Sequence, residues 1–579
     1  MKKNLHKLLA LTLSVILATG LLTACSSDDT PSADTPSTTT DGGSTTSDQT
    51  ADDSATQTDM VGTPGIAGYV PFEETVTLRF PVYDRGENSL QPVDNNFWTD
   101  YLQEKFGDQY NINLEFVPIE RWNQMVDYAL LAAGGILPTF LMEYDYWRLA
   151  TWVNDGYMRP FDMNEFAFVA PDYYNRMVED GQIPYSQMQG DTYFVLADRP
   201  FWNTSYRFLN FVRMDWLREV GFDRTPVGWA EETEAARLIK EAGLCTYPFG
   251  GFAITGIGSD QNYGMRGFPM DEEEWARYSS MGVYTMGWEP AKEFLRRENV
   301  RFAEGLMHPE FFIRTEDDQM ASFINGEIYR FGGYMASTVD FLLAFYEQNP
   351  GAELAVLPVL TEATDMETPV FRTDNPFGMT IGFSSQATDD EIKAAWMMLE
   401  WMSQDDNLFE FSWGFEGEHW EYDEEGYPVS YGEYTGSNPM GFNSNKDYWC
   451  IAVESRVVGT GTAEHAIRAN APQGLPQDFY PDMMQVYYDQ EALSAQGYGI
   501  IDPLFAEVIE AEAEYREALS AMYIEYRDRL IMTAPEEFSA LYDELSEHYK
   551  SQGFQEIADA RAALYHAGQS THLPEAARK

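Results

Sequence analysis

The sequence is poor in basic residues and in cysteine. It contains 37 Lys and Arg residues against 94 Asp and Glu residues, which gives a formal net charge of −57. A charge that negative repels nucleic acid and anionic lipid headgroups, so we expect no nucleic-acid partner. The three cysteines form no CxxC motif, which argues against a structural zinc site. Cys245 and Cys450 lie far apart, and their spacing does not decide whether they pair.

Known catalytic motifs are also missing. The chain has no GxSxG, P-loop, HExxH or GxGxxG signature. His419 lies among acidic residues, but we interpret it as a surface or ligand-contacting side chain rather than a metal ligand. The acidic run 271–274 is typical of a solvated helix start and lacks the alternating oxygen ligands of an EF-hand. We therefore expect no catalytic residue, no metal site and no cofactor.

The N-terminus is typical of an exported protein. A lysine-rich start precedes the apolar stretch 8–22, which is too short for a good membrane-spanning helix. The sequence LTAC at 22–25 resembles the lipobox of bacterial lipoproteins. This resemblance implies that residues 1–24 are a signal peptide and that Cys25 carries lipid chains, which anchor the protein on the extracellular face of the cell membrane. An ordinary signal peptide with a chance cysteine is the alternative.

The next segment, residues 25–69, consists almost entirely of Ser, Thr, Asp, Gly, Pro and Ala. It has too little apolar surface to offset the entropy of an ordered chain, so we expect a disordered linker. The rest of the chain is longer than a segment that folds around a single hydrophobic core usually is, which indicates two or more lobes. Aromatic residues make up 15% of the chain, which leaves aromatic surface for a ligand.

Strands and helices alternate in the first part of this body. Alternating or β-branched runs predict strands at 76–82, 112–117 and 138–142, and helical spacing of apolar residues predicts helices at 97–106 and 121–133. This alternation is typical of an α/β fold with a parallel sheet. One face of the second helix is apolar and is expected to pack into the core. Its side chains are Trp122, Met125, Val126, Ala129, Leu130 and Ala133.

Further elements are expected later in the chain. They are helices at 214–220, 231–242 and 290–304 and a strand at 378–383. Thr388 and Glu391 form a capping box that starts another helix. The tail from position 503 is helical, with a second capping box at Thr533 and Glu536. The interval 413–471 shows no clear period and is interpreted as ordered loops.

Several short segments, in a common order over nearly the whole chain, are similar to landmarks of one family. They are LPTF at 137–140, 152–162, GDTYFVL at 190–196, VRMDWL at 212–217, 304–311, 323–327 and GFEGEHW at 414–420. Together with the lipobox-like segment, this set resembles the family 1 extracellular solute-binding lipoproteins of bacterial carbohydrate ABC importers, in particular their long Gram-positive subgroup. The chain departs from that pattern at 196–199, where a proline is usual, and before His419, where the loop is one residue longer. Both departures concern the ligand more than the fold.

The resemblance implies a type II periplasmic-binding-protein fold, in which two α/β lobes are joined by crossing strands and a helical tail ends the chain. The expected crossings are 197–211, 370–377 and 468–476. The first lobe then combines 70–205 with 375–470, and the second combines 206–374 with 471–579. A ligand closes the cleft between such lobes by a hinge motion.

The same resemblance implies that the chain, as a monomer, captures an oligosaccharide in the interlobe cleft and delivers it to ABC permease subunits, without being an enzyme. Sugars present C–H faces that stack on aromatic rings and hydroxyls that form charge-assisted hydrogen bonds. Loops near strand ends and crossings can supply both. The expected contact residues are Tyr83, Asp145, Trp202, Asn203, Arg213, Trp413, Glu416 and Trp420.

Other interpretations compete with these. Arg213 could instead pair with Asp215, and Trp413 could belong to the core. The chain could also be an extracellular polysaccharide-processing enzyme. A third possibility is a binding protein for another solute, such as a peptide or a polyamine, whose positive charge the acidic surface would tolerate. The high aromatic content favours a sugar.

Overall fold

The computed structural model describes residues 62–86, 89–204, 208–251, 270–279, 282–334, 339–357, 369–431, 445–470 and 479–578. They belong to one unit, Met60–Lys579. The predictions for the signal peptide, Cys25 and most of the linker lie outside the described residues. Within these ranges, no helix is both long enough and apolar enough to cross a lipid bilayer.

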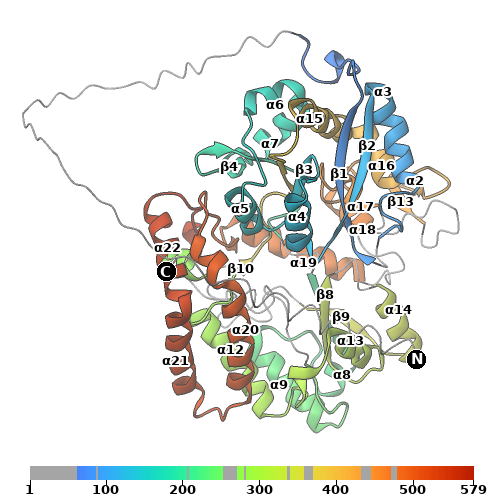
Figure 1. Cartoon of the computed structure of the whole chain (residues 1–579). Helices are drawn as coiled ribbons and strands as arrows, with labels where there is room; N and C mark the ends of the chain where they lie inside the picture. The colour runs from blue at the N-terminus through green and yellow to red at the C-terminus, as the bar shows by residue number, and fades with distance from the viewer. Residues whose placement is uncertain are drawn as a thin grey trace, which may run out of the picture. The chain divides into compact units, whose positions relative to one another are not determined.

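Two parallel strands open this unit. β1 (Val76–Asp84) and β2 (Ile112–Glu120) pair along their whole length. Between them, α2 (Phe97–Leu102) continues through a π-helical turn into α3 (Asp108–Tyr110), and the side chain of Asn96 caps α2. Figure 1 shows these elements, which confirm the strands and the helix predicted for this region.

The next sheet is antiparallel. β11 (Thr380–Phe383) lies between β3 (Phe140–Glu143) and β6 (Phe194–Leu196) and runs antiparallel to both. The expectation of a parallel sheet is therefore wrong for these strands. β11 arrives from a distant part of the chain, so no βαβ crossover fixes its direction. Every residue of the three strands is buried, which accounts for their almost continuously apolar sequences.

Helices pack on these strands and share one hydrophobic core with them. They are α4 (Gln124–Ala133), α5 (Tyr146–Asn154), α6 (Met163–Val169), α7 (Pro171–Glu179), α15 (Asp389–Ser403) and α16 (Asp405–Trp413). The core joins side chains from 78–197 to side chains from 377–453. The predicted capping box of α15 is confirmed, because Thr388 and Glu391 each accept a hydrogen bond from the other's backbone N–H.

The apolar face of α4 points outward, contrary to our expectation. Trp122, in the turn before α4, is 81% exposed, and Val126 and Leu130 of α4 are 50% and 67% exposed. The buried face carries Gln124 and Tyr128 instead. Gln124 donates a hydrogen bond to a buried glutamate of β3, and Tyr128 packs edge-on against a buried tryptophan of α5. The spacing of apolar residues correctly predicted a helix. The contacts of Gln124 and Tyr128, however, decide which side of it is buried.

A separate antiparallel sheet consists of β7 (Phe208–Arg213), flanked by β8 (Arg330–Tyr334) and β9 (Leu354–Val356). The helices of this region are α8 (Met214–Glu219), α9 (Gly228–Glu241), α11 (Glu272–Tyr278), α13 (Glu316–Ile324), α14 (Val339–Gln348) and α19 (Phe479–Ala495). α8 and α9 confirm the helices predicted there. Asp271 accepts a hydrogen bond from the backbone N–H of Glu274, as expected for a solvated helix start.

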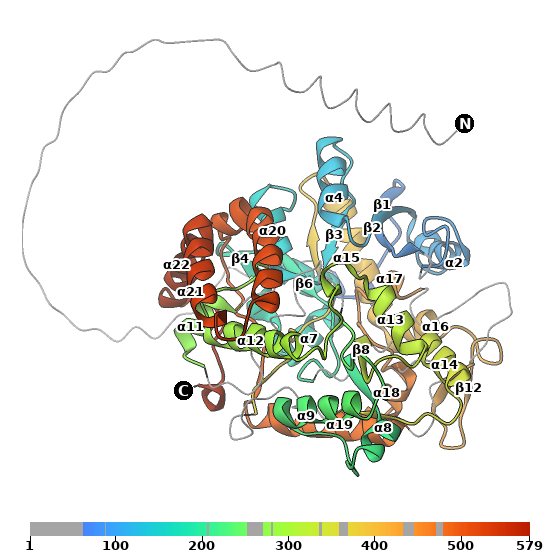
Figure 2. The ribbon, with the colours of Figure 1, turned by 90° about the horizontal axis from the view of Figure 1, so that it is seen from below.

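Long helices form the C-terminal part. They are α20 (Glu510–Met532), α21 (Phe538–Tyr549) and α22 (Gln555–His566), which pack with α12 (Glu289–Ala303) and α11 around an aromatic core (Figures 1 and 2). The predicted helical tail is confirmed, as is the helix at 290–304. The capping box at Thr533 is wrong. Thr533 ends α20, and its carbonyl accepts a hydrogen bond from Asn299 at 2.8 Å, so α21 begins only at Phe538.

Short elements complete the described part. They are β4 (Gln187–Met188), β5 (Asp191–Thr192), β10 (Phe371–Arg372), β12 (Trp420–Tyr422), β13 (Pro428–Ser430), β14 (Gly499–Ile500), α17 (Lys446–Trp449) and α18 (Ala463–Asn470). β10 pairs in parallel with β14, which brings two distant parts of the chain together. The interval 413–471, expected to be loops, contains two of these helices and a hairpin in its described residues.

Candidate functional site

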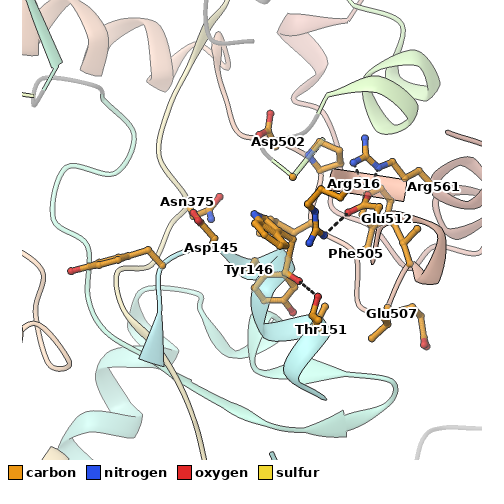
Figure 3. A pocket seen from close by; sticks show the side chains of 18 of the residues that line it. Asp145, Tyr146, Thr151, Asn375, Asp502, Phe505, Glu507, Glu512, Arg516 and Arg561 are labelled. Atoms are coloured by element: carbon orange, nitrogen blue, oxygen red, sulfur yellow. Dashed lines mark hydrogen bonds and ion pairs between the residues drawn. The ribbon is translucent and has the colours of Figure 1, made fainter. Parts of the chain in front are cut away.

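A cavity of about 250 Å³ lies where three separate parts of the chain meet (Figure 3). The first part is 144–151 with Arg199, the second is the segment around β10, and the third is 502–516 with Arg561. Side chains that are hundreds of positions apart in sequence therefore face the same space. Its lining mixes aromatic rings with paired charges, and we take it as the candidate functional site.

The wall next to β3 is fixed by Glu143, the last residue of that strand. Glu143 is fully buried and accepts hydrogen bonds from the backbone N–H of Tyr144 at 2.8 Å and from Arg148 at 3.2 Å. Asp145 then begins α5 and pairs with Arg148 at 2.8 Å. Burial and the neighbouring Glu143 raise the pKa of Asp145. A carboxylate that lies on a cavity wall beside a cation is suited to accept hydrogen bonds from a polar ligand.

Aromatic side chains form much of the remaining wall. Tyr144, Tyr146 and Trp147 come from the start of α5, and Phe505 comes from the segment before α20. Arg516 of α20 lies over the Trp147 ring, with its guanidinium carbon 3.6 Å from the ring centre. Burial lowers the pKa of Arg516 to about 10. This contact joins the C-terminal helices to the wall that β3 and α5 provide.

Most charges in the cavity are balanced by ion pairs. Arg372 lies 2.8 Å from Asp502, and Arg561 lies 2.6 Å from Glu512. Figure 3 shows Arg516 and Arg561 directed at Glu512. Such a site offers hydrogen-bonding groups without a strong net charge, beside apolar ring faces. Chemically, it suits a neutral ligand that carries both hydroxyls and C–H faces.

The described residues contain no group of three or more His, Cys, Asp or Glu side chains arranged to hold a metal ion. Cys245 and Cys450, whose pairing the sequence left open, are both free thiols. Burial raises the pKa of each thiol to about 12, so neither is a ready nucleophile.

No protein-family model and no curated protein sequence matches the chain. Solved structures do match. An extracellular solute-binding protein from Bifidobacterium longum subsp. infantis has a TM-score of 0.61 at 13% identity, over 87% of this chain and 100% of that one. An HMO-binding, ABC-transporter-associated protein from the same species has a TM-score of 0.58 at 13% identity, over 86% and 99%. The alginate-binding protein AlgQ2 has a TM-score of 0.56 at 14% identity, over 86% and 99%.

The chain has the fold of the extracellular solute-binding proteins. The α/β fold class predicted from the ordered motifs is thereby confirmed. The match with the first of these proteins covers 87% of this chain.

Among the eight predicted contact residues, Asp145 lines the cavity. Tyr83, the residue before the last in β1, is fully buried and donates a hydrogen bond from its hydroxyl to the carbonyl of Met142 at 2.6 Å. Arg213 pairs with Asp215 at 2.9 Å, which is the alternative that the sequence left open. Its guanidinium also stacks on a tryptophan of α8. These side chains are therefore occupied within the protein.

The predicted tryptophans differ from one another. Trp413 and Trp420 are almost fully buried, and each donates its indole N–H to a backbone carbonyl at 3.1 Å. Trp202 is 39% exposed and Asn203 is half-buried, and both lie in the turn before β7. Glu416 is exposed in the loop before β12. Contact of these residues with a ligand stays a prediction.

Trp147, Phe505 and Arg516 line the cavity but were not predicted from the sequence. Trp147 follows a predicted strand within the run Tyr-Asp-Tyr-Trp, so the rule that ligands lie at strand ends could have found it. Phe505 and Arg516 belong to the tail that we interpreted as packing helices. No local pattern marks them, because their role depends on contact with a segment more than 350 positions earlier.

Proposed function

We propose that this chain is a substrate-binding protein of the family 1 type, which captures an oligosaccharide outside the cell and delivers it to the permease of an ABC importer. The cavity carries this proposal, since it combines aromatic rings with balanced ion pairs in a solute-binding-protein fold. The binding of HMO and of alginate by proteins of the same fold supports a carbohydrate ligand.

We further propose that the cavity lies between two lobes, 70–205 with 375–470 and 206–374 with 471–579. The distribution of the hydrophobic cores supports this division. One core uses residues within 78–197 and 377–453, whereas the other cores use residues within 209–370 and 467–577. The cavity takes lining residues from both sets. A ligand held there would favour the closed arrangement, because only that arrangement provides all contacts.

The proposed role is binding without catalysis. A hydrolase needs a carboxylic acid that can give up a proton and a second carboxylate at a suitable distance. In the cavity, Asp145, Asp502 and Glu512 are each paired with arginine, so these three carboxyl groups are already engaged within the protein. These pairs support the assignment as a receptor rather than an enzyme.

A glycan screen tests the proposal. The protein without residues 1–24 is heated with neutral and acidic oligosaccharides, and with peptides and polyamines as competing ligand classes. A ligand at a hundred times its Kd should add about 2.7 kcal/mol to the free energy of unfolding and raise the thermal midpoint. Mass spectrometry should recover the bound sugar intact. Shortened products would contradict the receptor role, and a response to peptides or polyamines alone would contradict a sugar ligand.

We also propose that Cys25 anchors the protein, as a monomer, on the extracellular face of a cell membrane, as in a Gram-positive lipoprotein. The lysine-rich start, the apolar stretch and the LTAC sequence support this. Cys25→Ser should abolish labelling by a fatty-acid probe and release the protein from the membrane or leave its signal uncleaved. Retention of the label and of membrane attachment in this variant would contradict the anchor.

A further inference from the structure

Trp122 is the most exposed tryptophan of the chain. All 14 tryptophans lie among the described residues, and ten of them are buried. Trp122 is 81% exposed, whereas Trp202, the other exposed one, is 39% exposed. A large aromatic side chain left in water forgoes the stabilisation that burial would give. An exposed tryptophan of this degree therefore calls for a function at the surface.

The Trp122 ring is nevertheless held on one side. The guanidinium carbon of Arg121 lies 4.7 Å from the centre of the Trp122 ring. Arg121 is only 7% exposed and also lies 5.0 Å from the Tyr83 ring and 5.4 Å from the Tyr144 ring. Its Nε and Nη1 have no hydrogen-bond partner in the described part of the chain. Arg121 is thus fixed by aromatic faces, and it supports one face of Trp122 while the rest of that ring stays open.

Trp122 lies at the sheet edge that leads to the cavity. It follows the end of β2, whose last residue pairs in register with the last residue of β1. Tyr144 follows the end of β3, a strand of the next sheet that contacts β1, and it lines the cavity. The Tyr144 ring contacts Arg121 at 5.4 Å and Arg199, another lining residue, at 5.9 Å. Tyr144 and Arg121 therefore connect the cavity wall directly to Trp122.

The size of the cavity indicates why a second contact is needed. Pockets that enclose whole drug-sized ligands usually measure about 300–1,000 Å³. The cavity, at about 250 Å³, lies below that range. We therefore expect the cavity to hold only part of an oligosaccharide, with the remaining units outside it.

We propose that Trp122 is an outer stacking site for the sugar, and that the ligand is an oligosaccharide of about three or more units, part of which lies in the cavity. This inference rests on the proposed function. The exposed ring face would stack on the C–H face of a sugar unit that has left the cavity, and Arg121 would keep the ring in place.

Chain-length series of neutral sugars test the inference. Malto-, fructo- and β-1,4-linked N-acetylglucosamine oligosaccharides of two to six units are titrated by calorimetry against the protein without residues 1–24. For the series that binds, wild-type affinity should rise with length. Trp122→Ala should lower the affinity of the longer sugars about tenfold and leave the disaccharide unchanged. Trp122→Phe should keep most of the gain in affinity, and Leu130→Ala, at an exposed position of α4, should have no effect.

A chemical measurement complements these titrations. The longest sugar should slow the oxidation of Trp122 by N-bromosuccinimide, mapped by mass spectrometry, and the disaccharide should not. If Trp122→Ala lowered the affinity for sugars of every length by the same factor, that result would contradict an outer site. Unchanged affinity together with lost cellular uptake would assign Trp122 to a protein partner and overturn the inference. If the wild-type protein binds no oligosaccharide in the neutral and acidic glycan screen, the proposed function itself fails. That outcome differs from sugar binding whose affinity does not depend on Trp122, which overturns only this inference.

Discussion

At the scale of residues, the candidate site is a set of charges that neutralise one another beside aromatic rings. Arg148 forms ion pairs with both Glu143 and Asp145. Arg372 forms an ion pair with Asp502. Each pair fixes side chains that would otherwise lose rotamer freedom when a ligand binds, which lowers the entropic cost of binding. Preorganised polar groups of this kind give a sugar site its selectivity.

Replacing Asp145 tests this arrangement. Asp145 makes no side-chain capping bond in α5, so Asp145→Asn should leave the helix intact. Loss of the carboxylate should weaken sugar binding by about 1.5–3 kcal/mol, the range for a hydrogen bond to a charged group. Calorimetry gives the affinity, and Asp155→Asn at the exposed other end of α5 is the control. Equal affinities for both variants and the wild type would show that the ligand does not contact Asp145.

A second residue predicts how stability depends on pH. Burial and the neighbouring Asp180 raise the pKa of Asp198 to about 6. Between about pH 4 and pH 6 the folded state therefore holds a proton that the unfolded state has lost, so stability falls as the pH rises. Asp198→Asn should raise the free energy of unfolding by about 1–2 kcal/mol at pH 7 and by little at pH 4.

Urea unfolding at both pH values measures the effect of Asp198→Asn. Asp191→Asn, at an exposed position in β5, is the control and should change neither value. A gain that is the same at pH 4 and pH 7 would show that packing or hydrogen bonding, and not the charge of Asp198, causes it.

Single residues were predictable only where a local rule applies. Asp145, predicted from the rule that ligands bind at strand ends, lines the cavity, and its contact with a ligand stays a prediction. The pairing of Arg213 with Asp215 was open as an alternative. The contact between Trp147 and Arg516 was not predicted, because it depends on how the C-terminal helices pack. Trp122 was assigned to the core because an apolar stripe usually marks the buried face of a helix.

At the scale of elements, the positions of helices follow from the sequence more directly than the direction of strands does. α15 shows why, since its capping box and its apolar spacing are both local signals. The antiparallel β3–β11–β6 sheet has no such signal, because β11 comes from a distant part of the chain. The false box at Thr533 shows the limit of local motifs, since Thr533 ends α20, where its carbonyl accepts a hydrogen bond from Asn299, and α21 begins only at Phe538.

The two capping sequences make a matched prediction. Thr388→Ala removes a side chain that accepts a hydrogen bond from the backbone N–H of Glu391, so it should cost about 1 kcal/mol of stability. Thr533→Ala should change stability by less than about 0.5 kcal/mol, because the Thr533 side chain caps no helix. Urea unfolding midpoints measure both. A larger loss for Thr533→Ala than for Thr388→Ala would contradict this assignment of the caps.

At the scale of the whole molecule, one hydrophobic core is made by residues of 78–197 and 377–453. The cavity is lined both by residues of this part and by residues of the C-terminal helices. The fold class was predictable because its motifs occur in order along the whole chain. The exact site was not, since it depends on the contact between distant parts. The central claim is that an oligosaccharide binds in this cavity and contacts both parts.

Hydrogen–deuterium exchange with and without a saturating amount of the sugar found in the screen tests that claim most directly. Bound sugar should slow exchange in two separate segments, 144–151 and 502–516, because both line the cavity. Protection of both segments by the same ligand is the result that we predict. Saturating binding that protects neither segment, or only one of them, would contradict the account.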